Sequence, residues 1–177
     1  MELTPRRGDS GFTNLGKTRV SKTDPRIKFM SLMDEMQAYV GLLHTYKCNK
    51  EINNRVSTIC NHFYEIMGLI HKTGNPSEED LKPYIEYLDN TVNVIKLMVP
   101  KVNVFIRPNK DTCIANLVRA RCRSIEVELR ILELNPHISV YFNRLSSVVY
   151  GIMLYYHHNK YNPIETRLLV IYILNSE

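Results

Sequence analysis

The stretch that decides the fold class is residues 135–152, NPHISVYFNRLSSVVYGI. It opens on Asn135 and Pro136, a capping residue followed by the residue that favours the first turn of a helix. Behind them apolar residues recur every three or four positions, which places them on one face of a helix. The members of this apolar face are Ile138, Tyr141, Phe142, Leu145, Val148, Val149 and Ile152. The stretch therefore predicts a long amphipathic helix.

The same spacing recurs upstream and predicts four further helices. They cover about residues 29–46, 53–71, 76–97 and 111–134. Short connections separate them, and five helices joined in this way are typical of an up-and-down bundle. The fold class expected is therefore all-α, a five-helix up-and-down bundle.

The segments outside the helices divide the chain into three expected parts. Residues 1–28 hold three of the seven glycines and little apolar periodicity, so they predict a loop-like N-terminal arm. Residues 29–160 form the helical bundle domain, with a short extended piece at 102–106, and residues 161–177 form a C-terminal tail. The apolar run at 167–174 fits a strand or a helix equally well.

The charge of the chain is concentrated in the arm. The 177 residues include 23 Lys and Arg against 18 Asp and Glu, a net charge of +5. Residues 1–28 hold seven of the bases and three of the acids, which accounts for +4 of this charge. The remainder is nearly neutral, which argues against a surface that coats nucleic acid. The length and the 44% of apolar residues fit one domain with its own core.

Several classes of protein are excluded by simple patterns. The longest apolar runs fall short of the roughly 20 residues that cross a membrane, and the start MELTPRRGDSGF lacks the apolar core of a signal peptide. The four cysteines form no CxxC pair, so we expect buried reduced thiols and no zinc. The six histidines lack ligand spacing and are expected at the surface or its boundary. We expect a soluble cytoplasmic protein with no membrane or nucleic-acid partner.

Residues 11–18, GFTNLGKT, match the P-loop pattern G-x-x-x-x-G-K-[ST]. A P-loop leaves a buried strand and opens a helix. Here no strand pattern precedes the motif, and the residues after it reach Pro25 without an apolar face. We therefore reject a P-loop fold. The hypothesis that this basic, glycine-containing loop lies near phosphates is retained.

Charged residues gather on the predicted fourth helix. Arg119, Arg123 and Glu126 are four and then three residues apart and share one face, whereas Arg121 and Glu128 point elsewhere. One interpretation is a solvated face of ion pairs worth a few tenths of a kcal/mol each. The other is an anion site in which arginine forks hold phosphate oxygens. The spacing does not choose between them.

Five stretches, spread over about residues 5–155, form a recognisable series. They are RRGDSGFTNLGKTRVSK at 6–22, MDEMQAYVG at 33–41, FIRP at 105–108, VRARCRSIEVELR at 118–130 and NPHISVYFNRLSS at 135–147. Together they resemble the successive signatures of the PduO-type ATP:corrinoid adenosyltransferases, and they occur in the order of that family.

The resemblance implies a fold and a reaction. Each subunit is a five-helix bundle, and three identical subunits form a homotrimer that binds ATP and the corrinoid at the subunit interfaces. The reaction transfers the 5′-deoxyadenosyl group of ATP, with Mg²⁺, to cob(I)alamin and releases triphosphate. A cobalamin reductase and a cobalamin-dependent acceptor enzyme are the implied protein partners. The alternative is a diverged, non-catalytic helical module that binds a corrinoid or a nucleotide.

The resemblance also implies which residues contact ATP. By this resemblance, the N-terminal arm of residues 1–28 binds the nucleotide. Mg²⁺ is expected to have no side-chain ligands, because the ATP phosphates hold it. The implied contacts are Arg7, Gly8, Asp9, Ser10, Gly11, Thr13, Lys22, Arg123, Glu126 and Asn143.

The implied corrinoid contacts are Phe105, Asp34 and Arg119, with Asp34 pairing with Arg119 and Phe105 crowding the lower axial face of the corrinoid. The implied catalytic residues are Arg123, Arg119 and Asp34.

The sequence departs from the family pattern at the nucleotide site. Ser124 and Val127 stand where arginines are expected, Arg7 replaces a threonine, and Pro108-Asn109-Lys110 replaces P-G-G. Ser124 and Val127 remove two expected cations near the nucleotide and Arg7 adds one, so the departures either weaken ATP binding or redistribute its contacts. The tyrosines of the fifth helix, such as Tyr150, are expected in helix packing and subunit contacts.

Overall fold

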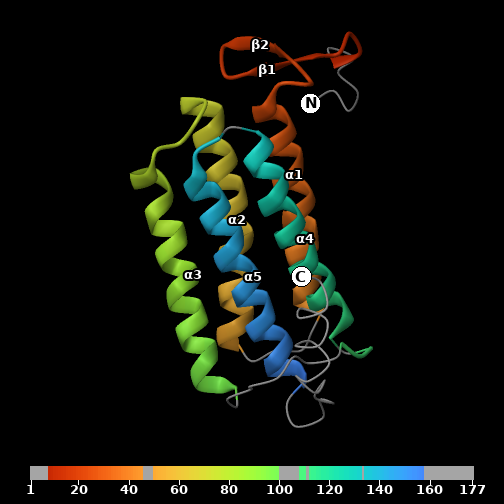
Figure 1. Ribbon diagram of the computed structural model, residues 1–177, viewed down its shortest axis with the longest axis vertical. Helices are drawn as coiled ribbons and strands as arrows, with labels where there is room; N and C mark the ends of the chain where they lie inside the picture. Colours follow the sequence, from red (N-terminus) through yellow and green to blue (C-terminus); the bar gives the residue numbers. More distant parts are fainter. Residues whose placement is uncertain (1–7, 46–49, 100–107, 111, 133, 158–177) are drawn as a thin grey trace, which may run out of the picture.

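The computed structural model describes residues 8–45, 50–99, 108–110, 112–132 and 134–157. Within these ranges the chain forms a bundle of α-helices that run alternately up and down, with a small β-hairpin beyond one end (Figure 1). The helices are α1 (Pro25–Gly41), α2 (Lys50–Thr73), α3 (Glu78–Met98), α4 (Cys113–Ile131) and α5 (Pro136–His157), and a short 3-10 helix, η2 (Leu42–Thr45), follows α1. The predicted five-helix all-α fold is confirmed.

The observed helix boundaries follow local capping. Helix α1 begins at Pro25 rather than near residue 29, because the Asp24 carboxylate accepts a hydrogen bond from the Arg26 backbone N–H at 2.9 Å. Helix α3 begins after a capping box in which Ser77 and Asp80 bond reciprocally. Helix α4 ends at Ile131, before the expected residue 134. The predicted extended piece at 102–106 and the tail at 161–177 lie outside the described residues.

Helix α5 lies between α3 and α4, and α1 and α2 complete the bundle (Figure 1). Its predicted apolar face is confirmed, because every member of that face is at most 1% exposed. Each such side chain contributes roughly 1.5 to 3 kcal/mol on burial. Gly151 lets α5 approach α3 closely, since a Cβ atom there would lie 2.8 Å from Cγ2 of Ile95.

The arm folds into a hairpin where we expected a loop. Strands β1 (Phe12–Leu15) and β2 (Thr18–Ser21) pair antiparallel, with Phe12 opposite Ser21. Gly16 takes a positive φ of 58° in the turn between them, a conformation that glycine adopts without steric cost. Because Gly16 and Lys17 connect two antiparallel strands rather than a strand and a helix, the rejection of a P-loop is confirmed.

The cysteines only partly match the expectation of buried thiols. Cys122 is buried, which raises the pKa of its thiol to about 12 and keeps it neutral. Cys60 is half-buried and Cys113 is exposed at the start of α4, so the expectation is wrong for Cys113. None of these three cysteines forms a disulfide. In the described part of the chain, no helix is both long and apolar enough to cross a membrane.

His62 is buried in the core, which corrects the expectation that the histidines lie at the surface. It is 5% exposed, and its ring meets the rings of Tyr84 and Tyr87 edge-on at 4.9 and 5.0 Å between centroids. Its Nδ1 lies 3.4 Å from the Tyr141 hydroxyl. Burial lowers the pKa of His62, although the charge of Glu65 acts in the opposite direction.

The buried His62 predicts a loss of stability in acid. A lowered pKa in the folded state means that neutral His62 contributes stability above the unfolded pKa of about 6.5. This contribution is lost as the pH falls through the folded pKa, by up to about 1.4 kcal/mol per pH unit. Urea unfolding between pH 7.5 and 5 should therefore show a weaker pH dependence in His62→Phe than in the wild-type protein.

The control for this experiment is His44→Phe, at an exposed histidine of η2. It should keep the wild-type pH dependence. A wild-type slope in His62→Phe would show that another group controls acid stability.

Candidate functional site

Helix α4 presents its arginines on two faces, as the spacing predicts. Arg121 faces α1, where its guanidinium donates to Glu35 at 2.6 and 3.0 Å, and it also bonds Glu128 on its own helix at 2.9 Å. The hydrogen bond to Glu35, followed by that to Glu128, raises the pKa of Arg121. Arg121 is therefore a structural ion-pair residue that fixes the rotation of α4 against α1.

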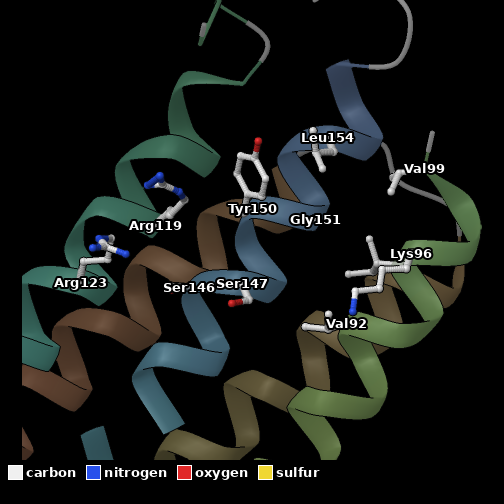
Figure 2. A pocket seen from close by; sticks show the side chains of 11 residues that line it. Val92, Lys96, Val99, Arg119, Arg123, Ser146, Ser147, Tyr150, Gly151 and Leu154 are labelled. Carbon is white, nitrogen blue, oxygen red and sulfur yellow. The ribbon is translucent and has the colours of Figure 1, made fainter. Parts of the chain in front are cut away.

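On the other face, Arg119 and Arg123 line a groove of about 470 Å³ between α3, α4 and α5 (Figure 2). The Arg119 guanidinium stacks on the Tyr150 ring at 5.5 Å from the centroid, a cation–π contact. Arg123 is exposed and has no ion-pair partner among the described residues. The remaining lining residues are Val92, Ile95, Lys96, Val99, Ser146, Ser147, Gly151 and Leu154. The groove thus combines an apolar floor with three cations and no acid.

Glu126 and Asn143 meet at a second hollow, of about 510 Å³, between α4 and α5. The Asn143 amide nitrogen lies 3.3 Å from Oε1 of Glu126. Arg144 donates to the Asn143 amide oxygen at 3.1 Å and pairs with Asp89 of α3 at 2.9 Å. These bonds fix the Asn143 amide with its NH₂ group towards the carboxylate. Glu126 is one helical turn from Arg123, so the two hollows adjoin along α4.

The arm residues from Gly8 to Lys22 form a compact unit. The Gly11 N–H donates to the Gly8 carbonyl at 3.2 Å, and the Lys22 N–H donates to the Gly11 carbonyl at 2.9 Å. The Lys22 ammonium lies against Gly8, because a Cβ atom on Gly8 would be only 3.0 Å from Nζ. Ser10 accepts a hydrogen bond from Arg19 at 3.1 Å. Asp9 is exposed in the same turn.

His71 connects the hairpin to the bundle. The Gly16 N–H points at the edge of the His71 ring, 3.1 Å from Nε2 and 3.3 Å from Nδ1. A Cβ atom on Gly16 would lie 3.0 Å from the His71 carbonyl oxygen, so the turn packs directly on the end of α2. Thr13 and Lys22 line a third hollow, of about 580 Å³, at the junction of the hairpin with α1.

The single chain does not bring all the predicted residues together. The hairpin lies beyond the end of the bundle where α4 finishes, whereas Arg119 is in the first half of α4 (Figure 1). Asp34 is exposed on α1, and within the described part of the chain no ion pair joins it to Arg119. Arg7 and Phe105 lie outside the described residues. The implied site is therefore divided between the arm and the side of the bundle.

Sequence reasoning missed several groove residues. Tyr150 and Ser147 on α5 and Lys96 on α3 line the groove, but each comes from a different helix from the arginines, and no local spacing links them. Tyr150 does more than pack helices, because it holds Arg119. Among the described residues, no group of three or more His, Cys, Asp or Glu side chains could hold a metal.

Comparison with known proteins gives a consistent result. The family model described as cobalamin adenosyltransferase matches residues 3–156. A cobalamin adenosyltransferase of Cupriavidus metallidurans is 30% identical over 84% of this chain and 84% of its own length. The corrinoid adenosyltransferase PduO of Citrobacter freundii is 29% identical over 86% of this chain. This chain spans about half of that relative, 49% of its length.

Solved structures share the fold. A variant PduO-type ATP:corrinoid adenosyltransferase from Lactobacillus reuteri, complexed with cobalamin and ATP, superposes with a TM-score of 0.73 at 19% identity. The match covers 92% of this chain and 98% of that chain. Because the family model matches most of the chain, the chain belongs to the cobalamin adenosyltransferases.

Proposed function

We propose that this protein transfers the 5′-deoxyadenosyl group of ATP to the cobalt of cob(I)alamin and releases triphosphate. The observation that carries the proposal is the α4 face that holds Arg119 and Arg123 above an apolar groove, next to the Glu126–Asn143 pair. The relatives named as corrinoid or cobalamin adenosyltransferases support the same reaction.

In this reaction no side chain of the protein forms a covalent bond with a substrate. In this reaction cobalt(I) is the nucleophile and attacks C5′ of ATP; a cobalt–carbon bond forms, the C5′–O bond breaks, and the electron pair leaves with triphosphate. No serine, cysteine or histidine nucleophile is therefore needed. The protein supplies orientation of the two substrates and positive charge at the departing triphosphate. Mg²⁺ enters with ATP as part of the substrate.

The ATP side consists of the arm and the Arg123 region. Arg123 has no ion-pair partner among the described residues, so its planar fork is available for phosphate oxygens. Lys22 supplies a second cation from the arm. Asn143 and Glu126 offer donors and acceptors suited to the polar edges of the nucleoside. Gly8 and Gly11 let the arm backbone approach the nucleotide closely.

The corrinoid side consists of the groove beside Tyr150. Its floor is formed by apolar side chains of α3 and α5 such as Ile95 and Leu154, which suit the hydrophobic edge of a large macrocycle. Tyr150 holds the Arg119 guanidinium at the rim. Asp34 would orient Arg119 from a neighbouring subunit, and Phe105 would exclude a lower axial ligand from cobalt and so ease its reduction to cob(I).

A homotrimer unites the divided site. The arm of one subunit would close on the α4 face of the next, because one chain holds these groups at separate places (Figure 1). An exposed apolar stripe along α4 suits such a subunit contact. Its large members, Leu117, Val127 and Ile131, are 51%, 63% and 76% exposed. A cobalamin reductase would deliver the reduced substrate, and a cobalamin-dependent enzyme would accept the product.

The second candidate is a corrinoid- or nucleotide-binding module without turnover. Ser124 and Val127 favour it, because both are exposed on α4 beside Arg123 and neither offers a cation. Incubation with ATP, Mg²⁺ and chemically reduced cobalamin decides between the two. We expect the absorbance change of adenosylcobalamin formation; binding of both substrates without this product would establish the module instead.

Arg123→Ala should reduce kcat by roughly ten- to a hundredfold or more, because it removes a charge-assisted contact to the leaving triphosphate. Circular dichroism should show unchanged helical content, since Arg123 is exposed. Lys82→Ala, at an exposed lysine of α3 whose only described ion pair is a long 3.9 Å contact, is the control and should keep normal turnover. Normal turnover in Arg123→Ala would remove Arg123 from the catalytic set.

Asp34→Asn should raise the KM for the corrinoid severalfold and leave the KM for ATP within about twofold, because the lost charge orients Arg119 on the corrinoid side. Steady-state kinetics with each substrate varied in turn measure the two constants. A defect confined to ATP would contradict the assignment of Asp34.

The mass in solution tests the trimer. Light scattering coupled to gel filtration should give three times the mass of one chain. A monomeric mass under assay conditions, with full activity, would exclude a site shared between subunits.

A further inference from the structure

We propose that Lys28 of α1, together with the hydroxyls of Thr23 and Ser31, forms a second triphosphate-binding group beside Lys22. The family resemblance assigns no role to these three residues. The inference rests on the proposed function in one respect, because the ligand is the polyphosphate of the nucleotide substrate.

The hollow at the junction of the hairpin and α1 already contains two of the implied ATP contacts. Its lining residues are Thr13, Lys22, Thr23, Ile27, Lys28 and Ser31. Thr13 and Lys22 are the contacts that the resemblance identifies, so an ATP molecule that reaches them also reaches the first turns of α1. The remaining members come from the turn before α1 and from α1 itself.

The polar groups of this hollow suit phosphate rather than an adenine ring. Two ammonium groups and three hydroxyl groups line it, and the lining includes no carboxylate and no aromatic ring. Ammonium and hydroxyl groups donate hydrogen bonds to phosphate oxygens. A purine ring would need an apolar or aromatic surface, and Ile27 alone supplies apolar contact here.

Asp24, the acid closest in sequence to Lys28 and Lys22, does not neutralise the two lysines. Asp24 caps α1 and its carboxylate forms a two-bond fork with the Arg26 guanidinium at 2.7 and 2.9 Å. These bonds lower the pKa of Asp24, the side-chain bond to Arg26 being the largest cause. In the described ranges neither Lys22 nor Lys28 has an ion-pair partner. An anion in the hollow would therefore meet two uncompensated cations.

The position of Lys28 on its helix adds to this positive potential. Lys28 is the fourth residue of α1, close to the positive end of the helix dipole, and the first turn of α1 contains no acid. Two lysines around one hollow repel each other, and a bound polyanion would relieve that repulsion. On α4 the positions beside Arg123 are Ser124 and Val127, so the arm and α1 provide the additional cations.

The test compares Lys28→Met with Lys17→Met by calorimetric titration of the full chain with MgATP and with inorganic triphosphate. Lys17 is the matched control, because it is an exposed lysine in the turn of the same hairpin and does not line the hollow. We expect Lys28→Met to weaken binding of both ligands by roughly tenfold. Lys17→Met should stay within about twofold, and Lys28→Arg, which keeps the charge, within about threefold.

The inference is overturned by unchanged affinity in Lys28→Met, by an equal loss in Lys17→Met, or by an equal loss in Lys28→Arg. The last result would mean that the shape of the side chain, rather than its charge, matters. The proposed function fails separately. If the wild-type protein binds MgATP but forms no adenosylcobalamin, the transferase proposal falls while a loss of affinity in Lys28→Met still supports the phosphate group.

Discussion

The burial of α5 between α3 and α4 is the contact on which the candidate site depends. The apolar face of α5 is at most 1% exposed, so the rotation of this helix about its axis is set by the core. That rotation leaves Asn143 and Tyr150 half-buried at the edge of the face, directed towards α4. A truncation such as Leu145→Ala would cost about 2 to 5 kcal/mol in the core and would also loosen the positions of both site residues.

Helix α4 is positioned from its opposite face. The bonds between Arg121 and Glu35 join α4 to α1, and they lie on the side away from α5. With this ion pair on one side and the core on the other, Arg119 and Arg123 point into the groove. Arg121 therefore forms structural ion pairs, whereas Arg119 and Arg123 form no ion pair among the described residues and carry the ligand contacts of the proposed function. An arginine fork is costly to leave unpaired in the core but not at a rim open to water.

The distribution of positive charge follows the division of the site. Most of the net positive charge of the chain lies in its first 28 residues. The hairpin in this arm is anchored to the bundle by the contact between Gly16 and His71 and by the Asp24–Arg26 cap of α1. The cations of α4 and α3 gather separately, around the groove. In the proposed trimer the triphosphate would lie between the arm of one subunit and the α4 face of the next. Its negative charge would offset the repulsion between these two positive surfaces.

The sequence by itself determined the helical class, the number of helices and the shared face of Arg119, Arg123 and Glu126, because these follow from a periodicity that is local to each helix. It also excluded a P-loop from the residues around Gly16. It did not predict the hairpin, whose two strands have only four residues each, or the burial of His62 among tyrosines of other helices. Only the tertiary structure decided that Tyr150 stacks on Arg119, that Glu35 pairs with Arg121, and that Lys28 lines the same hollow as Lys22. Contacts between elements depend on helix rotation and packing, which the whole core sets and no single stretch encodes.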